Sequence, residues 1–250
     1  FHKDAVITGG TAANGGNIEA YAGGYITING ATVRDGYASS RGGNLYAYIF
    51  YSGAVWGDWL DISLNEMESE SVFLSPVDFI AADFNGHDGC IYGYDELGQG
   101  YRFDPATGEC EMLGTPTNVQ LLDMAYDYSS GTMYAVAYDA STSTSTIYYV
   151  NLYTGALVEA GKVYDAMVTL ACDMEGKLYS ISSSGILFSL KRVAGAGGGG
   201  GIAPLAQTYA TAKVYHYERK EIMQLPVSGL FYAQSMCYDH NNDVILWANP

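Results

Sequence analysis

Short runs of apolar and aromatic residues alternate with glycine- and aspartate-rich segments along most of the 250-residue chain. β-Branched and aromatic residues favour strands, whereas Gly, Asp, Asn and Ser favour the turns between them. No stretch shows a sustained 3.6-residue apolar period with a cap, so we expect almost no helix. No run approaches the roughly 18 apolar residues that a membrane-spanning helix needs, so we expect no membrane insertion. The pattern predicts an all-β protein.

A four-residue motif that ends in aspartate recurs along the chain. Its copies end at Asp83, Asp127, Asp173 and Asp239. The first two intervals are 127 − 83 = 44 and 173 − 127 = 46 residues, which match the ~40–50 residues of a four-stranded propeller blade. The third interval, 239 − 173 = 66, is longer. We assign the surplus to a flexible Gly-rich insertion over residues 193–212.

Each motif is followed by a polar turn and by further short strands with Gly- or Asp-containing turns between them. A degraded first unit is expected over residues 45–78, and a fifth unit begins at Ala233. The sequence therefore predicts a β-propeller of four or more four-stranded blades over residues 45–250, in which the motifs form equivalent innermost strands around a shared axis.

The first 44 residues follow a different rule. Two Gly-Gly-Asn elements end at Asn17 and Asn44, and 44 − 17 = 27 residues is a plausible length for one coil of a parallel β-helix. Between them, residues 25–33 alternate like a strand. We therefore expect β-helix-like, glycine-rich coils over residues 1–44, ahead of the propeller.

The units around residues 124–134 and 151–157 resemble the blades of extracellular bacterial β-propeller proteins, which occur within large multidomain surface proteins of Gram-positive bacteria. The Gly-Gly-Asn coils resemble β-helix surface proteins and adhesins. The propeller resemblance covers about residues 45–250. It implies an extracellular or cell-surface location and a binding or adhesion role, and it supplies no catalytic residues, because propellers host many unrelated activities.

The net charge of the chain limits the classes of binding partner. Lys and Arg number 11 and Asp and Glu number 27, which gives a formal net charge of −16. Nucleic acids and anionic membranes would be repelled, so we expect a glycan or an extracellular protein as partner. Because the chain starts at Phe1 rather than Met and shows no leader, we expect it to be part of a larger polypeptide or assembly.

The recurring aspartates are candidates for an acidic ring or for calcium binding. The segment 83–89 places oxygen donors at alternate positions, which calcium prefers, and its candidate ligands are Asp83, Asn85 and Asp88. However, His87 replaces an oxygen donor within it. The alternative is that each aspartate caps its turn by accepting hydrogen bonds from backbone N–H groups. No other cofactor is expected.

The four cysteines lie in predicted strands. Cys172 and Cys237 fall within the inner-strand motif and are expected to be buried free thiols. Cys90 and Cys110 fall in the second and fourth strands of one unit, which are not neighbours in a simple meander, so a disulfide between them is open but not favoured. The absence of a C-x-x-C pattern argues against a thiol-zinc site.

No catalytic constellation emerges from the sequence: none of the four histidines lies in a recognisable nucleophile, zinc or phosphate motif. Aromatic side chains beside carboxylates suit sugar rings through stacking and hydrogen bonding. The candidate ligand-binding residues are Trp56, Asp58 and Trp59 in a Gly-containing loop, with Tyr138 beside the Ser/Thr loop 141–146. The alternative for Trp59 is that it begins a strand and packs between blades.

These observations favour a non-catalytic extracellular surface or adhesion module that binds a glycan or protein through loops on one propeller face. Two alternatives stay open. One is a secreted carbohydrate-active hydrolase or lyase with carboxylates in the central channel, which would need two or three carboxylates in one pocket with raised pKa values. The other is a structural spacer in a large surface or filament assembly.

Overall fold

The computed structural model describes residues 6–8, 11–14, 32–34, 37–41, 45–50, 57–63, 68–75, 77–193, 215–227, 229–230, 234–239 and 243–248. Within these ranges, side chains are described for Trp59 and, with few exceptions, from Leu74 onward. The described residues form strands and no helix, which confirms the all-β prediction for this part of the chain. Among them, no helix is long and apolar enough to cross a membrane.

The chain divides into two compact units, residues 1–52 with 58–74 and residues 53–57 with 75–250. In the first unit, short strands pair in parallel: β1 (Val6–Thr8) with β3 (Thr32–Arg34) and β2 (Thr11–Asn14) with β4 (Tyr37–Arg41). A three-stranded sheet of order β5-β6-β7 follows; its strands are β5 (Leu45–Phe50), β6 (Gly57–Ser63) and β7 (Glu68–Ser75).

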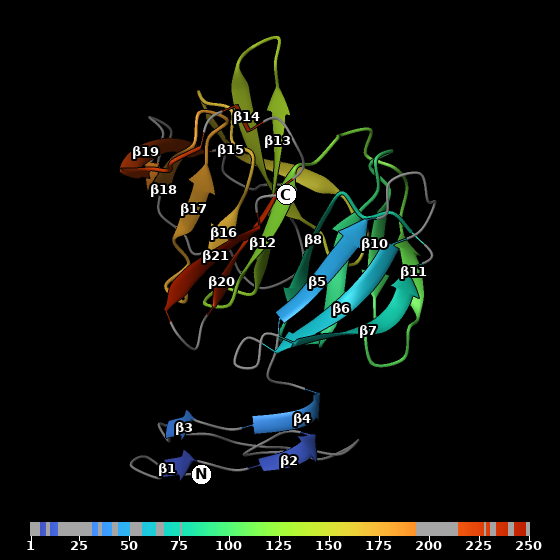
Figure 1. The fold of residues 1–250 in the computed structure, drawn as a ribbon. Helices are drawn as coiled ribbons and strands as arrows, with labels where there is room; N and C mark the ends of the chain where they lie inside the picture. The colour runs from blue at the N-terminus through green and yellow to red at the C-terminus, as the bar shows by residue number, and fades with distance from the viewer. Residues whose placement is uncertain are drawn as a thin grey trace. The chain divides into compact units, whose positions relative to one another are not determined.

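The second unit contains three successive four-stranded meanders and a hairpin (Figure 1). Meander A consists of β8 (Ala81–Asn85), β9 (Cys90–Tyr94), β10 (Gly100–Phe103) and β11 (Cys110–Leu113). Meander B consists of β12 (Asp123–Asp127), β13 (Thr132–Asp139), β14 (Thr144–Val150) and β15 (Leu157–Val163). Meander C consists of β16 (Ala171–Cys172), β17 (Leu178–Ile181), β18 (Ile186–Val193) and β19 (Tyr215–Gln224). Hairpin D consists of β20 (Ser235–Asp239) and β21 (Val244–Ala248).

The outer strands of meanders B and C also pair with each other. Strand β15 runs parallel to β19, with Gly161 opposite Tyr215 and Lys162 opposite His216. This pairing joins the two meanders into one eight-stranded sheet. The predicted insertion over residues 193–212 lies outside the described residues except at Val193, the last residue of β18.

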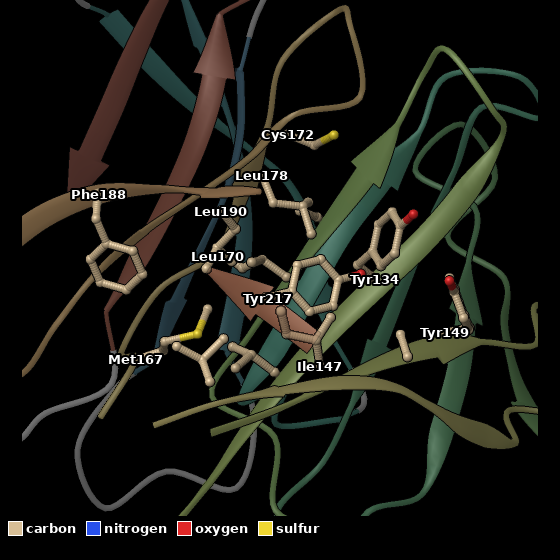
Figure 2. Close-up of a cluster of buried hydrophobic side chains, with 14 residues drawn as sticks. Tyr134, Ile147, Tyr149, Met167, Leu170, Cys172, Leu178, Phe188, Leu190 and Tyr217 are labelled. Carbon is tan, nitrogen blue, oxygen red and sulfur yellow. The ribbon is translucent and has the colours of Figure 1, made fainter. Parts of the chain in front are cut away.

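The core lies between the faces of successive meanders, because strand β13 is buried on both sides. Tyr134 and Val136 point into a cluster shared with meander C, whereas Met133 and Ala135 point into a cluster shared with meander A. Strand side chains alternate between the two faces of a sheet, so consecutive residues serve different cores. Figure 2 shows the cluster between B and C, in which Phe188 and Ile147 are fully buried.

The first strands of the meanders gather together. Strand β12 packs against β8, β16 and β20, which come from the neighbouring meanders and from hairpin D. The motif-bearing strands therefore lie close together, whereas their arrangement around a shared axis stays a prediction.

One part of the repeat prediction is wrong. Asp83 pairs across its hairpin with Tyr92, and the residue that pairs in the same way with Tyr134 in meander B is Ala125, not Asp127. The residue of meander A that corresponds to Asp127 is Asn85. The motif copy in meander A is therefore displaced by two residues, because its turn is formed by a later asparagine.

Candidate functional site

The turns between the first and second strands of meanders A, B and C lie close to one another; they are residues 85–89, 127–131 and 173–177. We call these turns, together with the side chains of Tyr179, Tyr238 and Asp243, the turn face. A Cβ atom added at Gly86 would lie 2.6 Å from Cε1 of Tyr128. A Cβ atom at Gly176 would lie 2.7 Å from Oγ of Ser129. Each turn therefore contacts the next one directly, which places their side chains on one continuous surface.

Aspartates shape two of these turns. The carboxylate of Asp127 accepts hydrogen bonds from the backbone N–H of Ser129 at 2.8 Å and from the hydroxyls of Ser129 and Ser130. The carboxylate of Asp173 accepts from the backbone N–H groups of Glu175 and Lys177, each at 2.9 Å. These contacts are the turn-capping role that aspartate fills well.

The turn of meander A carries the predicted calcium ligands. Oδ1 of Asn85 accepts a hydrogen bond from the backbone N–H of His87 at 2.9 Å. Oδ1 of Asp88 accepts from the backbone N–H of Cys90, and Oδ2 accepts from the hydroxyl of Tyr92 at 2.6 Å. The geometry matches turn formation for both residues. Among the described residues, no group of three His, Cys, Asp or Glu side chains is arranged to hold a metal ion, and calcium binding by this segment stays a prediction.

Asp83 has a different role. Its carboxylate accepts hydrogen bonds from the backbone N–H of Phe84 at 2.8 Å and from that of Tyr126, in the first strand of meander B, at 2.6 Å. Burial raises the pKa of Asp83 to about 6, although both hydrogen bonds lower it. Asp83 thus connects two meanders instead of capping a turn.

Asp123 forms a second and more deeply buried connection. Its carboxylate accepts hydrogen bonds from the backbone N–H groups of Met124, Leu170 and Met236. Burial raises the pKa of Asp123 well above the usual range for aspartate, and the nearby charge of Asp83 raises it further. Both carboxylates bear raised pKa values, but their oxygens are engaged with backbone N–H groups.

Aromatic rings pack together where the turns of meanders A and B meet. The hydroxyl of Tyr126 lies 2.6 Å from Nδ1 of His87, and the Tyr126 and Tyr128 rings meet edge to face with centroids 5.0 Å apart. Burial raises the pKa of Tyr126 to about 12, and the nearby Asp88 and Asp127 carboxylates add to the effect. Tyr126 is itself buried, whereas His87 and Asp88 are exposed.

A second aromatic group lies between meander C and hairpin D. The rings of Tyr179 and Tyr238, both half-buried, are nearly parallel at 17°, with centroids 6.4 Å apart. The Tyr179 hydroxyl donates to Asp173 at 3.0 Å, and the Tyr238 hydroxyl donates to Asp243. Nζ of Lys177 lies 4.8 Å from the centroid of the Tyr179 ring. This group combines accessible aromatic surface with charged side chains of both signs.

The structure describes only part of the set of ligand-binding residues proposed from the sequence. Trp56 lies outside the described residues, and Asp58 is described only as backbone of strand β6. The Trp59 side chain, within strand β6, is 4% exposed, so the expectation that its ring offers an exposed face to a sugar is wrong; packing of this ring between blades stays a prediction. Tyr138 is half-buried on strand β13, opposite Ser145.

All four cysteines are free thiols. Strand β10 separates the strand that carries Cys90 from the strand that carries Cys110. Burial foremost, together with three nearby aspartates, raises the thiol pKa of Cys237 to about 12. These thiols are poor nucleophiles at neutral pH.

The Tyr179–Tyr238 pair is not among the residues that the sequence pattern singled out. A signal for it exists in the repeat. Tyr92, Tyr134 and Tyr179 occupy equivalent positions in the second strands of meanders A, B and C, and Tyr238 directly precedes Asp239 in the motif. The contact between the two rings depends on the packing of hairpin D, which the repeat alone does not specify.

Comparison with known proteins bears on the fold. No protein-family model matches the chain, and no curated protein matches its sequence significantly. A chain in the crystal structure of a nidogen/laminin complex is similar over 82% of this chain and 68% of its own length, with a TM-score of 0.52 and 12% sequence identity. This likeness and the successive antiparallel sheets support a β-propeller fold.

Two other solved structures are more distant. A structural genomics protein of unknown function from Bacteroides thetaiotaomicron has a TM-score of 0.48 and 13% identity over 80% of this chain, which spans 52% of that protein's length. An oligogalacturonate lyase in complex with manganese has a TM-score of 0.39 and 11% identity over 54% of this chain and 39% of its own. This chain thus spans about half the length of the Bacteroides protein.

Proposed function

We propose that this chain is a non-catalytic extracellular surface or adhesion module that binds a glycan through the turn face. The observation that carries the proposal is the Tyr179–Tyr238 pair, whose half-buried rings lie beside Lys177 and two carboxylates. Aromatic faces stack on the apolar faces of sugar rings, while charged and polar neighbours bond the hydroxyls. The extracellular location rests on the resemblance of the repeat units to bacterial surface propellers.

We further infer that meanders A, B and C are blades of the propeller and that hairpin D begins another. The parallel pairing of β1 with β3 and of β2 with β4 supports β-helix-like coils over residues 1–44. Paired residues there, such as Val6 and Thr32, are 32 − 6 = 26 positions apart, close to the expected coil length of 27. Such coils fit a chain that belongs to a larger surface protein.

A carbohydrate-active enzyme is the second candidate, and it has one observation in its favour. Asp83 is only partly buried and has a pKa of about 6, which suits a general acid near neutral pH. Against it, both oxygens of Asp83 accept backbone hydrogen bonds, and so do both oxygens of the neighbouring Asp123. An acid–base pair would have to break these bonds, so binding is the better supported function.

Binding of the purified chain to a glycan array tests the proposal. Tyr179→Ala and Tyr238→Ala are expected to reduce binding at least tenfold. Tyr164→Ala is a matched control. Tyr164 is 77% exposed and directly follows β15, on the side of the meander away from the turn face. Trp56→Ala tests the residue proposed from sequence. Absence of binding to any glycan by the folded chain would overturn the carbohydrate proposal.

A further inference from the structure

The two rings of the Tyr179–Tyr238 pair leave aromatic surface uncovered by each other. Their planes are nearly parallel, but their centroids are 6.4 Å apart, well beyond the roughly 3.5–4 Å at which stacked carbon atoms touch. The two rings therefore do not stack in full face-to-face contact. We call the pair, whose rings come from the strands β17 and β20 that are far apart in the sequence, the aromatic platform.

Each ring of the platform has a carboxylate on its hydroxyl. Tyr179 donates to Asp173, and Tyr238 donates to Asp243. A hydrogen bond from a phenol to a carboxylate pushes electron density into the ring and makes its face more attractive to a cation. The pKa values of both tyrosines are raised to about 12, by burial foremost for Tyr179 and by the Asp243 hydrogen bond foremost for Tyr238. Both rings therefore keep their hydroxyl protons at neutral pH.

The platform already holds a cation. The ammonium group of Lys177, an exposed side chain, lies 4.8 Å from the centre of the Tyr179 ring, within the range of a cation–π contact. Asp173, Asp243 and Glu175 are all close enough to act electrostatically on Tyr179. Three carboxylates and one lysine thus surround the Tyr179 ring in a chain with a net charge of −16, so the surroundings favour an additional positive charge.

We propose that the glycan bound by the turn face is an amino sugar, whose ammonium group takes the place of the Lys177 ammonium over the Tyr179 ring. This inference rests on the proposed glycan-binding function. The sugar ring stacks on the platform, and the Asp173 and Asp243 carboxylates offset the charge of its amine. A uronate or sialylated glycan would meet the same carboxylates with a like charge and would be repelled.

Calorimetric titration of the full chain with three probes tests the inference. A glucosamine oligosaccharide is expected to bind at least tenfold more tightly at about pH 6 than the N-acetylated oligosaccharide of the same length, which has the same ring and no charge. An oligogalacturonate is expected to bind more weakly than either. Equal binding of the amino and acetylated probes would overturn the amino-sugar inference and leave the glycan proposal standing.

Substitutions separate the platform from general charge attraction. Tyr179→Ala is expected to reduce binding of the glucosamine oligosaccharide at least tenfold. Lys177→Ala is expected to tighten it several-fold, because the competing ammonium is removed, whereas Lys191→Ala, which removes an exposed lysine of strand β18, leaves it unchanged. Equal tightening by both lysine variants, or unchanged binding by Tyr179→Ala, would show general attraction to a polyanion and overturn the inference. Absence of binding to all three probes by the folded chain would overturn the amino-sugar inference. The proposed function would be overturned as well only if the folded chain bound no glycan on the whole array.

Discussion

The carboxylate of Asp123 accepts a hydrogen bond from the backbone N–H of Leu170 at 2.7 Å, although the two residues are 47 positions apart. The same oxygen accepts from the N–H of Met236 at 3.3 Å. One side chain of strand β12 therefore holds the residue before β16 and a residue of β20. Asp83 forms the same kind of connection, because its carboxylate accepts a hydrogen bond from the backbone N–H of Tyr126 in the next meander. These first strands do not pair with one another through backbone hydrogen bonds. Hydrogen bonds from backbone N–H groups to aspartate side chains join them instead.

Replacing Asp123 is expected to destabilise the protein strongly. Asp123→Ala leaves buried N–H groups without their acceptor, and each such loss costs about 1–3 kcal/mol. We expect the free energy of unfolding to fall by about 3 kcal/mol in urea denaturation. Asp139→Ala is the control, because Asp139 caps an exposed turn. Equal effects of the two substitutions would contradict the bracing role of Asp123.

Asp83 should make the stability depend on pH. Its pKa is about 6 in the folded chain, against an ordinary value of 3.8, so the folded state holds the proton more tightly than the unfolded state. Its contribution to stability is therefore greatest below about pH 4 and is lost as the pH rises through about 6. The difference in unfolding free energy between the wild type and Asp83→Asn, which cannot titrate there, should shift against the wild type between about pH 4.5 and pH 7.5. A difference that stays constant would contradict this prediction.

Two glycines with positive φ should differ in their tolerance of alanine. A Cβ atom at Gly114, where φ is 56°, would lie 2.2 Å from the backbone oxygen of Thr154, whereas one at Gly89, where φ is 74°, would meet nothing within 4 Å. Gly89→Ala is expected to cost about 1–2 kcal/mol from backbone strain alone. Gly114→Ala should cost clearly more, because the loop at Thr154 must move. Thermal unfolding of the two variants measures the difference, and equal melting temperatures would refute the close approach.

The cysteines should react only after unfolding. Burial raises the thiol pKa of Cys90, Cys110, Cys172 and Cys237, so little thiolate is present at about pH 8. We expect the native chain to incorporate iodoacetamide slowly and the denatured chain to incorporate it at all four positions, as measured by mass spectrometry. A mass that shows only two reactive thiols after denaturation without reductant would reveal a disulfide and contradict the free state.

The strands, the turns between them and the turn-capping aspartates could be predicted from the sequence. Short β-branched and aromatic runs between glycine and aspartate turns predicted the strands, and the spacing of the motif predicted the meanders, since each side-chain type has a strong preference for strand or turn. The capping roles of Asp127 and Asp173 were readable for the same reason. Paired residues of β1 and β3 are 32 − 6 = 26 positions apart, close to the 27-residue spacing of the Gly-Gly-Asn elements, and the β-helix-like coils stay a prediction.

The repeat did not determine its own register in meander A. Side chains alternate along a strand with a period of two, so a displacement of two residues keeps the same faces buried and looks equivalent in the hydrophobic pattern. Only the hairpin pairing shows that Asn85, not Asp83, occupies the position of Asp127. The role of Asp83 in joining two meanders likewise depends on tertiary structure, because the N–H group that it accepts from belongs to Tyr126 of the next meander.

The sequence by itself determined which segments become strands, where they turn and how large the repeating unit is, because these features depend on neighbours a few positions away. The tertiary structure alone decided which distant groups meet: Asp123 with Leu170, strand β15 with β19, and Tyr179 with Tyr238. These contacts depend on how successive sheets pack on their buried faces, and many sequences with the same strand pattern would pack with other partners in contact.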